Sequence, residues 1–232
     1  MGATWTDDFG VSDDPDRFDA AVAAFRKKVP VTEDEWKELD EYERERAFKV
    51  AAVASADLVQ DVFDAIERAI ADGTTLDEFR DAVGDQLAEA WGGEDPSALE
   101  AVFRTNVLGA YNAGRYEELS SPEAREARPY WVFRAIEDDR IDDECEEADG
   151  TILPADDTWW SFHIPPLHIN CRCSYTALSE AEAAEEGGAT DNPPAAEADE
   201  GFGRPPRVDE WEPSTDRFDD EIAGALEREL AD

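Results

Sequence analysis

Basic residues are scarce in this chain of 232 residues. Lysine and arginine together number 21, against 60 aspartates and glutamates, so the formal net charge is -39. Only four of the basic residues are lysines, at positions 27, 28, 37 and 49. Because proteins bind nucleic acids by neutralising phosphates with Lys and Arg, this shortage argues against a broad DNA- or RNA-binding surface.

Long apolar runs are also missing. No stretch approaches the ~18 apolar residues of a membrane span, and the opening Met-Gly-Ala-Thr-Trp-Thr-Asp-Asp lacks the charged start of a signal peptide. The Gly-x-x-x-x-Gly-Lys-Ser/Thr loop of nucleotide-driven motors is absent as well. We therefore expect no membrane partner and a cytoplasm-like compartment, where clustered cysteines bind metal more often than they form disulfides.

The excess of acid does not indicate disorder, because 41% hydrophobic and 10% aromatic residues are enough to build a core. A folded protein tolerates such charge in concentrated salt, where the Debye length falls to about 3 Å and self-repulsion is screened. The preference for arginine over lysine agrees with this interpretation. We predict a halophilic source; a protein that stays folded and monodisperse at low salt, by circular dichroism and light scattering, would contradict it.

The few sulfur and imidazole groups are clustered. All three cysteines and both histidines of the chain fall between positions 145 and 173. Thiolate and imidazole are the ligands that zinc prefers, and a structural site uses four of them. The candidate ligands are Cys145, His168, Cys171 and Cys173, with His163 as an alternate, and an iron-type ion could occupy the same position.

Two other interpretations of this cluster remain open. One is a metal-free knuckle in which His168 and Asn170 hydrogen-bond to the backbone and the cysteines are small buried apolar residues. The other is a disulfide from Cys145 to Cys171 or Cys173, which would leave one cysteine unpaired.

The first half of the chain predicts a helical bundle over residues 15–120, after a flexible acidic lead-in at 1–14. Apolar residues recur at helical spacing, and Thr32 with Glu35 and Thr75 with Glu78 form capping-box patterns. We expect a long helical region from Thr32 to Asp72, then helices up to Gly92 and from Pro96 toward Tyr116.

The pattern changes at Pro129, where Tyr-Trp-Val-Phe-Arg-Ala-Ile follows as the best strand candidate. Asp149-Gly150 predicts a hairpin turn, after which residues 151–153 would form the returning strand. Residues 174–177 would form a third strand. The acidic run 137–144 is expected to be a solvated turn. The predicted class is α+β, mainly α, with a small antiparallel β subdomain at 129–186 that carries the Cys/His knuckle. So small a sheet buries little apolar surface, and we expect a bound metal ion to stabilise it.

Residues 187–232 are rich in Gly, Pro, Ala and acid, and predict a flexible acidic tail that consists of a linker and a short C-terminal helix. Apolar residues of this helix, Phe218, Ile222, Leu226 and Leu230, recur at helical spacing. Such a helix could dock on the body of the protein or on a partner.

Several motifs carry a resemblance to a known family. They are Phe103-Arg104-Thr105-Asn106, Ala110-Tyr111-Asn112-Ala113-Gly114-Arg115, Asp138-x-Arg140, Cys145 with Asp149-Gly150, and Pro165-Pro166-Leu167-His168-x-Asn170-Cys171-Arg172-Cys173. Over roughly residues 20–185 the chain resembles the phage head-morphogenesis, or minor head protein, family whose namesake is the F protein of phage Mu. It departs from the usual pattern at Ile141, Asp142 and Asp143, which leaves Cys145 as the sole upstream cysteine.

The resemblance implies a virion protein present in few copies at the portal vertex or in the head interior, and in the host cytoplasm during assembly. It implies a non-enzymatic role in head morphogenesis and in genome packaging or delivery, with the portal protein and capsid or scaffold proteins as partners and contact with packaged DNA. It also implies that Arg104, Asn106 and Arg115 brace the helical half against the sheet, and that the cysteines and His168 form a zinc knuckle. The other motif residues would be structural: Asp138, Arg140, Asp149, Gly150, Pro165, Pro166, Asn170 and Arg172.

Two alternative functions follow from the residues. A zinc ion with an open coordination position could support hydrolysis, with Glu144 or Glu146 as base. A zinc knuckle could instead bind nucleic acid through Arg172 and the tryptophans Trp159 and Trp160, although these two aromatics are typical of a core.

Overall fold

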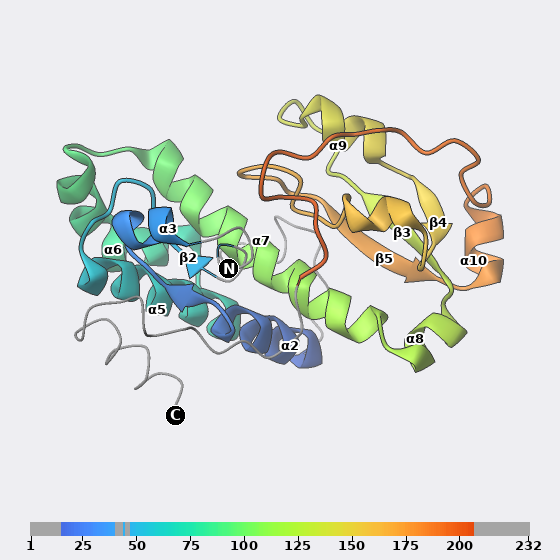
Figure 1. Cartoon of the computed structure of the whole chain (residues 1–232), viewed down its shortest axis with the longest axis horizontal. Helices are drawn as coiled ribbons and strands as arrows, with labels where there is room; N and C mark the ends of the chain where they lie inside the picture. Colours follow the sequence, from blue (N-terminus) through green and yellow to red (C-terminus); the bar gives the residue numbers. More distant parts are fainter. Residues whose placement is uncertain (1–14, 40–43, 45–46, 207–232) are drawn as a thin grey trace.

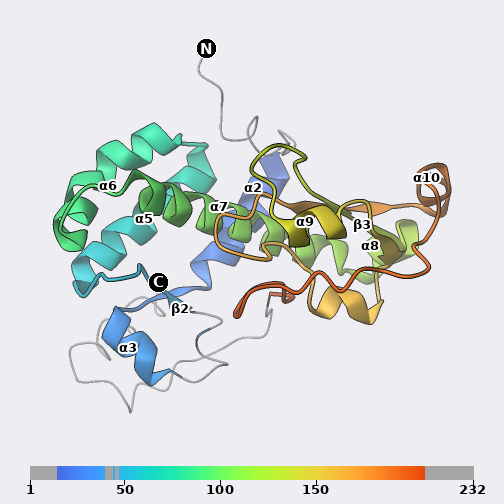
Figure 2. The same ribbon diagram turned by 90° about the horizontal axis from the view of Figure 1, so that it is seen from above.

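The longest helix, α7 (Pro96–Leu119), runs between a helical half and a half built on a small sheet (Figures 1 and 2). The computed structural model describes residues 15–39, 44 and 47–206. The predicted lead-in at 1–14 and the predicted C-terminal helix lie outside the described residues. Among the described ones, no helix combines the length and apolar character that a bilayer crossing requires.

The helical half packs α7 against three further helices. These are α2 (Pro15–Arg26), α5 (Ala56–Asp72) and α6 (Leu76–Trp91). Their ends follow local chemistry: Thr75 and Glu78 form the predicted capping box, and Gly73 and Gly92 end α5 and α6 in the left-handed conformation. The shared core is apolar and aromatic, with the rings of Phe25 and Phe63 stacked at 4.5 Å.

The prediction of one long helical region from Thr32 to Asp72 is wrong. The segment contains α3 (Glu33–Glu38), then β2 (Ala47–Phe48), which pairs in parallel with β1 (Val29–Pro30), and α5 begins only after its N-cap Ser55. Val50 and Val53 are buried in the irregular chain between β2 and α5. The spacing of these apolar residues therefore results from their burial and does not indicate a helix.

The predicted small antiparallel sheet is confirmed, as is the α+β class. It has the strand order β4-β3-β5, formed by β3 (Tyr130–Arg134), β4 (Ile152–Pro154) and β5 (Ser174–Leu178). Val132 in the central strand lies opposite Ile152 on one side and Thr176 on the other. Four short elements complete this half: α8 (Pro122–Ala127), α9 (Asp143–Ala148), the 3-10 helix η1 (Thr158–Ser161) and α10 (Glu180–Glu185).

The connection from β3 to β4 is not the tight hairpin predicted at Asp149-Gly150. It contains α9, so the acidic run expected to be a solvated turn ends inside a helix. Asp149 and Gly150 still close this loop onto the end of β3. The Asp149 Oδ1 accepts from the Ala135 amide at 2.6 Å, and the Gly150 amide donates to the Phe133 carbonyl at 3.0 Å.

Residues 188–206, which we call the strap, are part of the packed structure and do not form the linker that their composition predicts. The Thr190 amide donates to the Ile152 carbonyl at 2.7 Å, and the Asp199 amide to the Leu167 carbonyl at 2.8 Å. Gly203 exchanges two further bonds with the segment 164–166, and its φ of +76° favours glycine. Because these bonds use backbone groups, side-chain composition did not reveal them.

Helices α2 and α7 approach each other most closely at Gly114. A Cβ atom at this position would lie 2.6 Å from the backbone carbon of Ala20 and 2.6 Å from the Ala21 nitrogen. Backbone atoms cannot move aside without shifting a helix, so only glycine fits here.

Replacing Gly114 with alanine is expected to destabilise the protein by about 1–3 kcal/mol, because the added methyl group overpacks the contact between α2 and α7. Chemical denaturation monitored by circular dichroism measures the change. Gly109→Ala is the matched control: it lies on the same helix, and its new Cβ would have only Pro166 atoms nearby, at 4.0 Å. It should be neutral or stabilise by up to about 1 kcal/mol through helix propensity. Equal destabilisation by both variants would contradict the packing argument.

Candidate metal centre

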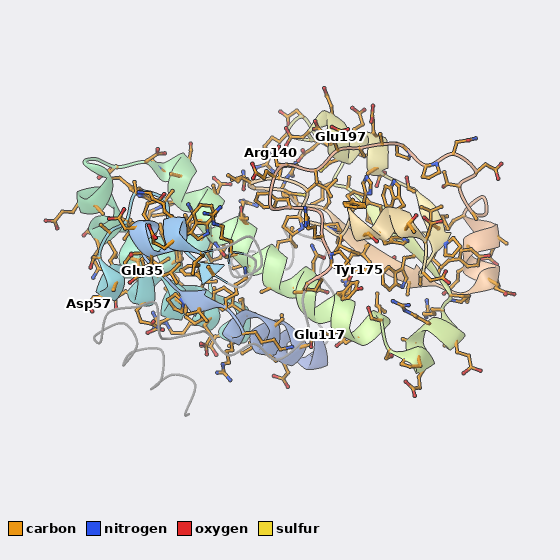
Figure 3. The ribbon with its side chains drawn as sticks, viewed as in Figure 1. Glu35, Asp57, Glu117, Arg140, Tyr175 and Glu197 are labelled. Carbon is orange, nitrogen blue, oxygen red and sulfur yellow. The ribbon has the colours of Figure 1, made fainter. Side chains whose placement is uncertain are left out.

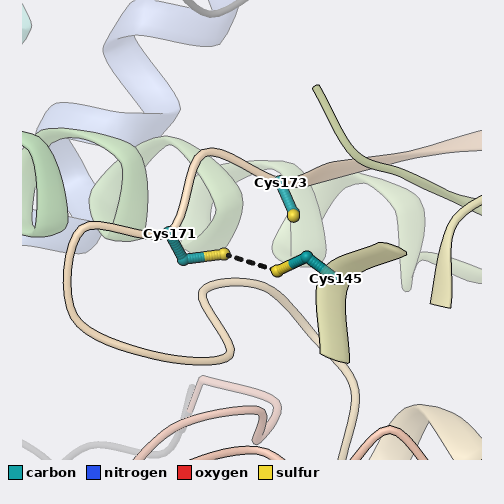
Figure 4. Close-up of side chains that lie close together, drawn as sticks. All are labelled: Cys145, Cys171 and Cys173. Carbon is teal, nitrogen blue, oxygen red and sulfur yellow. Dashed lines mark hydrogen bonds between the residues drawn. The ribbon is translucent and has the colours of Figure 1, made fainter. Parts of the chain in front are cut away.

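Three buried cysteines meet at the junction of α9, the loop before β5 and β5 itself (Figure 4). Cys145 comes from α9, while Cys171 and Cys173 come from the loop, and all three sulfurs lie within 4.8 Å of one another. Their residues are at most 2% exposed. The structure thus brings together the three predicted cysteine ligands, close enough to hold a metal ion.

The sulfur separation distinguishes between the interpretations of this cluster. The Cys145 and Cys171 sulfurs are 3.7 Å apart, and all three thiols are free. A disulfide requires about 2.05 Å. Two thiolates on a tetrahedral zinc ion, with bonds of about 2.3 Å, would be about 3.8 Å apart. The observed spacing excludes a disulfide, and it suits both a shared tetrahedral ion and hydrogen-bonded thiols without a metal.

His168, the fourth predicted ligand, lies beside Cys145. Its Nε2 lies 3.2 Å from the Cys145 sulfur, and its Nδ1 lies 2.9 Å from the Ile169 carbonyl. A proton on Nδ1 donated to this carbonyl leaves the Nε2 lone pair directed at the cluster, which is how ligand histidines are usually oriented. Asp142 Oδ2 is also 3.2 Å from Nε2 and forms an ion pair with His168 when the ring is protonated. A metal ion bound through Nε2 would replace this ion pair.

The electrostatics of the four groups favour a cation. Hydrogen bonds with Cys145 and then Cys171 raise the pKa of His168 to about 11. Hydrogen bonds from Cys145 and Cys173 hold the pKa of Cys171 well below its ordinary value, while the pKa of Cys145 and that of Cys173 are raised. Three adjacent thiolates would repel one another, which is why only one of the three thiol pKa values is lowered. A divalent ion can replace the thiol protons.

His163, the predicted alternate ligand, lies away from the cysteines. Its ring stacks on Trp159 with centroids 3.8 Å apart and planes 2° from parallel. Its two nitrogens lie 2.7 Å from the Trp159 and Ala195 carbonyls. The Trp159 indole also donates to the Pro194 carbonyl at 2.8 Å, so this pair fixes the strap against η1.

Helix α7 holds the cysteine loop and β5 in place. The Asn170 amide donates to Thr105 Oγ1 at 2.8 Å, and the Asn112 side-chain amide donates to the Cys173 carbonyl at 3.1 Å. Arg115 donates to the Tyr175 carbonyl and, at 2.7 Å, to the Tyr111 hydroxyl. Tyr175 lies where the sheet faces α7 (Figure 3), and its hydroxyl donates to the Asn112 carbonyl at 3.3 Å.

Arg115, one of the three residues predicted to brace the helical half, reaches the sheet through the Tyr175 carbonyl. Asn106 donates to the Val102 carbonyl at 2.8 Å within α7, and the contacts of Arg104 include Glu100 at 2.6 Å. Thr105 and Asn112 were not predicted to have a role. Their spacing of seven residues, which puts two polar groups on one face of a helix, is the signal that could have found them.

Arg172 ties the loop after β3 to the segment between the two cysteines. Its guanidinium forms two bonds with Asp138, one of 2.6 Å, and Asp138 also accepts from the Arg140 amide at 3.0 Å. The Arg172 bond is the main reason that the pKa of Asp138 lies well below its usual range. The motif residues Asp138, Arg140 and Arg172 are thus in contact, and Pro165 and Pro166, joined by a cis peptide bond, precede the cysteine loop.

Comparisons with known proteins agree with this arrangement. The family described as "Phage Mu protein F like protein" matches residues 60–176, from α5 to β5. Protein F of Escherichia phage Mu, named as a capsid assembly protein, is 30% identical over 184 residues, which cover 72% of this chain and 42% of the relative. The Mu-like prophage FluMu F protein of Haemophilus influenzae is 34% identical over 158 residues, covering 62% of this chain and 38% of the relative. No solved structure matches.

The family match runs from α5 through α7 to β5, and so joins part of the helical half to the cysteine-containing sheet. The matched region covers half of the chain and includes the cysteine cluster and the residues of α7 that hold it. The chain belongs to the Phage Mu protein F like family. It spans about two fifths of the length of the curated relatives it matches.

The two histidines provide a matched test of the metal centre. We expect the purified protein to contain one zinc ion per chain by elemental analysis. His168→Gln should lower the zinc affinity at least about tenfold, because it removes a ligand. His163→Gln should keep its zinc, because this ring contacts the strap and not the cysteines. Zinc content unaffected by His168→Gln, or lost equally in both variants, would contradict the assignment.

Proposed function

We propose that this chain acts in head morphogenesis of a tailed virus, as a minor head protein in the head interior or at the portal vertex. The observation that carries the proposal is the family match over residues 60–176, because it includes both the cysteine cluster and all of α7. The relative from phage Mu is named for capsid assembly, which supports a role in the head.

The partners that we propose are the portal protein and capsid or scaffold proteins, met in the host cytoplasm during assembly. Through the portal the protein would act in genome packaging or delivery. A portal-mediated role fits the charge of -39 better than direct contact with DNA does, because an acidic surface repels phosphates. The side chains considered for stacking on bases are also inaccessible: Trp159 and Trp160 are 8% and 2% exposed, and Arg172 is bonded to Asp138.

We assign a structural and not a hydrolytic role to the proposed zinc ion. The burial of all three cysteines supports this, since a hydrolytic centre needs a coordination position that water and substrate can reach. The three clustered cysteines, with His168 Nε2 at 3.2 Å from the Cys145 sulfur, support a closed set of four ligands. The ion would join α9 to the segment before β5, and so stabilise a sheet whose longest strands have five residues.

Coexpression tests this function directly. The chain and the portal protein from the same viral genome are produced together in concentrated salt, and the portal is captured through an affinity tag. We expect the chain to co-purify, and to be found in purified virions by mass spectrometry. The portal protein of an unrelated tailed virus, tagged in the same way, is the control and should capture none.

A structural variant links this experiment to the cysteine cluster. Cys171→Ser should lose portal binding only if it also loses its folded signal by near-UV circular dichroism, because the cysteines are buried and cannot contact a partner. Absence of the wild-type chain from both the portal complex and the virion would refute the proposed function.

A further inference from the structure

A groove of about 1100 Å³ separates the helical half from the strap. One wall comes from α2, α3 and α7, and the other from the strap and the residues just after η1. Small residues of α7, Gly109 and Ala113, line it and leave room for a further segment of chain. This surface is separate from the cysteine cluster, which contributes no residue to it.

The helical wall of the groove carries most of its cations. Lys27 and Lys28, two of the four lysines in the chain, line it together with Arg44. Lys27 pairs with Glu117, and Arg44 lies over the ring of Trp36 at 4.2 Å. Lys28 is half-buried, and burial lowers its pKa. The strap wall carries the acids Glu197, Asp199 and Glu200, so acidic side chains of an occupant would face the helical wall and not the strap.

The groove also has apolar walls. Phe162 is 61% exposed, although most large apolar side chains of the described residues are buried. Trp36 and Phe202 line the same groove and are only half-buried. An occupant must therefore offer apolar side chains as well as negative charge, as an acidic amphipathic helix does.

The chain itself contains such a segment, and its path leads to the groove. The last described residues, Pro205 and Pro206, line the groove. The 26 residues that follow contain ten acidic side chains and three arginines, and place Phe218, Ile222 and Leu226 four residues apart. We propose that residues 207–232 dock in this groove, with their apolar side chains against Phe162 and Trp36 and their acids facing Lys27, Lys28 and Arg44.

The tether makes docking feasible at modest intrinsic affinity. Eleven residues separate Pro206 from Phe218, enough to reach about 36 Å when extended. A short flexible linker gives an effective concentration in the millimolar range, so even a weak contact is mostly formed within one chain. The same segment of a second copy would have to compete with this tethered one.

The four lysines allow a test on the full chain. A carbodiimide joins a lysine amine to a carboxylate without a spacer, so each product reports a direct contact. We expect cross-links from Lys27 or Lys28 to acidic residues of 207–232, identified by mass spectrometry. Lys37 is the internal control: it does not line the groove, so it should give no such products. Lys49 does not serve as a control, because its amine lies 3.8 Å from the ring centroid of Trp36, which lines the groove. Cross-linking from Lys37 equal to that from Lys27 and Lys28, or none to this segment, would overturn the proposal.

Two further arms identify the occupant and the apolar contribution. Mixing ¹⁵N-labelled and unlabelled chains distinguishes a tethered segment from that of a second copy; products that join both isotopes would overturn intramolecular docking.

The double variant Ile222→Asp with Leu226→Asp tests the apolar contribution and should abolish the Lys28 cross-links. Gly224→Asp with Ala231→Asp adds the same charge on the opposite side of the predicted helix and should keep them. Cross-links that survive the first double variant would mean that charge alone brings the groups together, which also overturns the proposal.

Discussion

The meeting of Cys145 with Cys171 and Cys173 is the constraint on which the smaller half of this protein depends. The sheet has three strands of three to five residues, and its core includes aromatic residues of β3, η1 and β5 packed with the three cysteines. The buried sulfurs lie between α9 and the start of β5, so a cation shared among them would join two segments that are 26 residues apart in sequence at Cys145 and Cys171. His168 and the ion pair of Arg172 with Asp138 fix the loop around this point.

Helix α7 connects the cysteine-containing half to the helical half. One side of it meets α2 at Gly114, where only a hydrogen atom fits. Another side meets the cysteine loop and β5 through Thr105, Asn112 and Arg115. Both halves therefore pack on the same helix, which lies entirely within the region of the family match.

Local signals in the sequence predicted much of this fold. Capping boxes at Thr32 and Thr75, and the change of pattern at Pro129, depend on neighbouring residues and could be recognised directly. The clustering of cysteines likewise predicted which sulfurs meet. The failures concern long-range packing: Val50 and Val53 are buried without a helix, and the strap is held by backbone bonds that its Gly, Pro and Ala content conceals. His163 was grouped with the ligands by sequence proximity, but stacking on Trp159 determines its position.

The central claim is that Cys145, His168, Cys171 and Cys173 share one zinc ion. X-ray absorption at the zinc edge of the purified protein tests it most directly, because it reports the ligand atoms themselves. The account predicts three sulfur ligands at about 2.3 Å and one nitrogen at about 2.0 Å. A shell of oxygen and nitrogen alone, or a protein that folds fully with no metal bound, would contradict it.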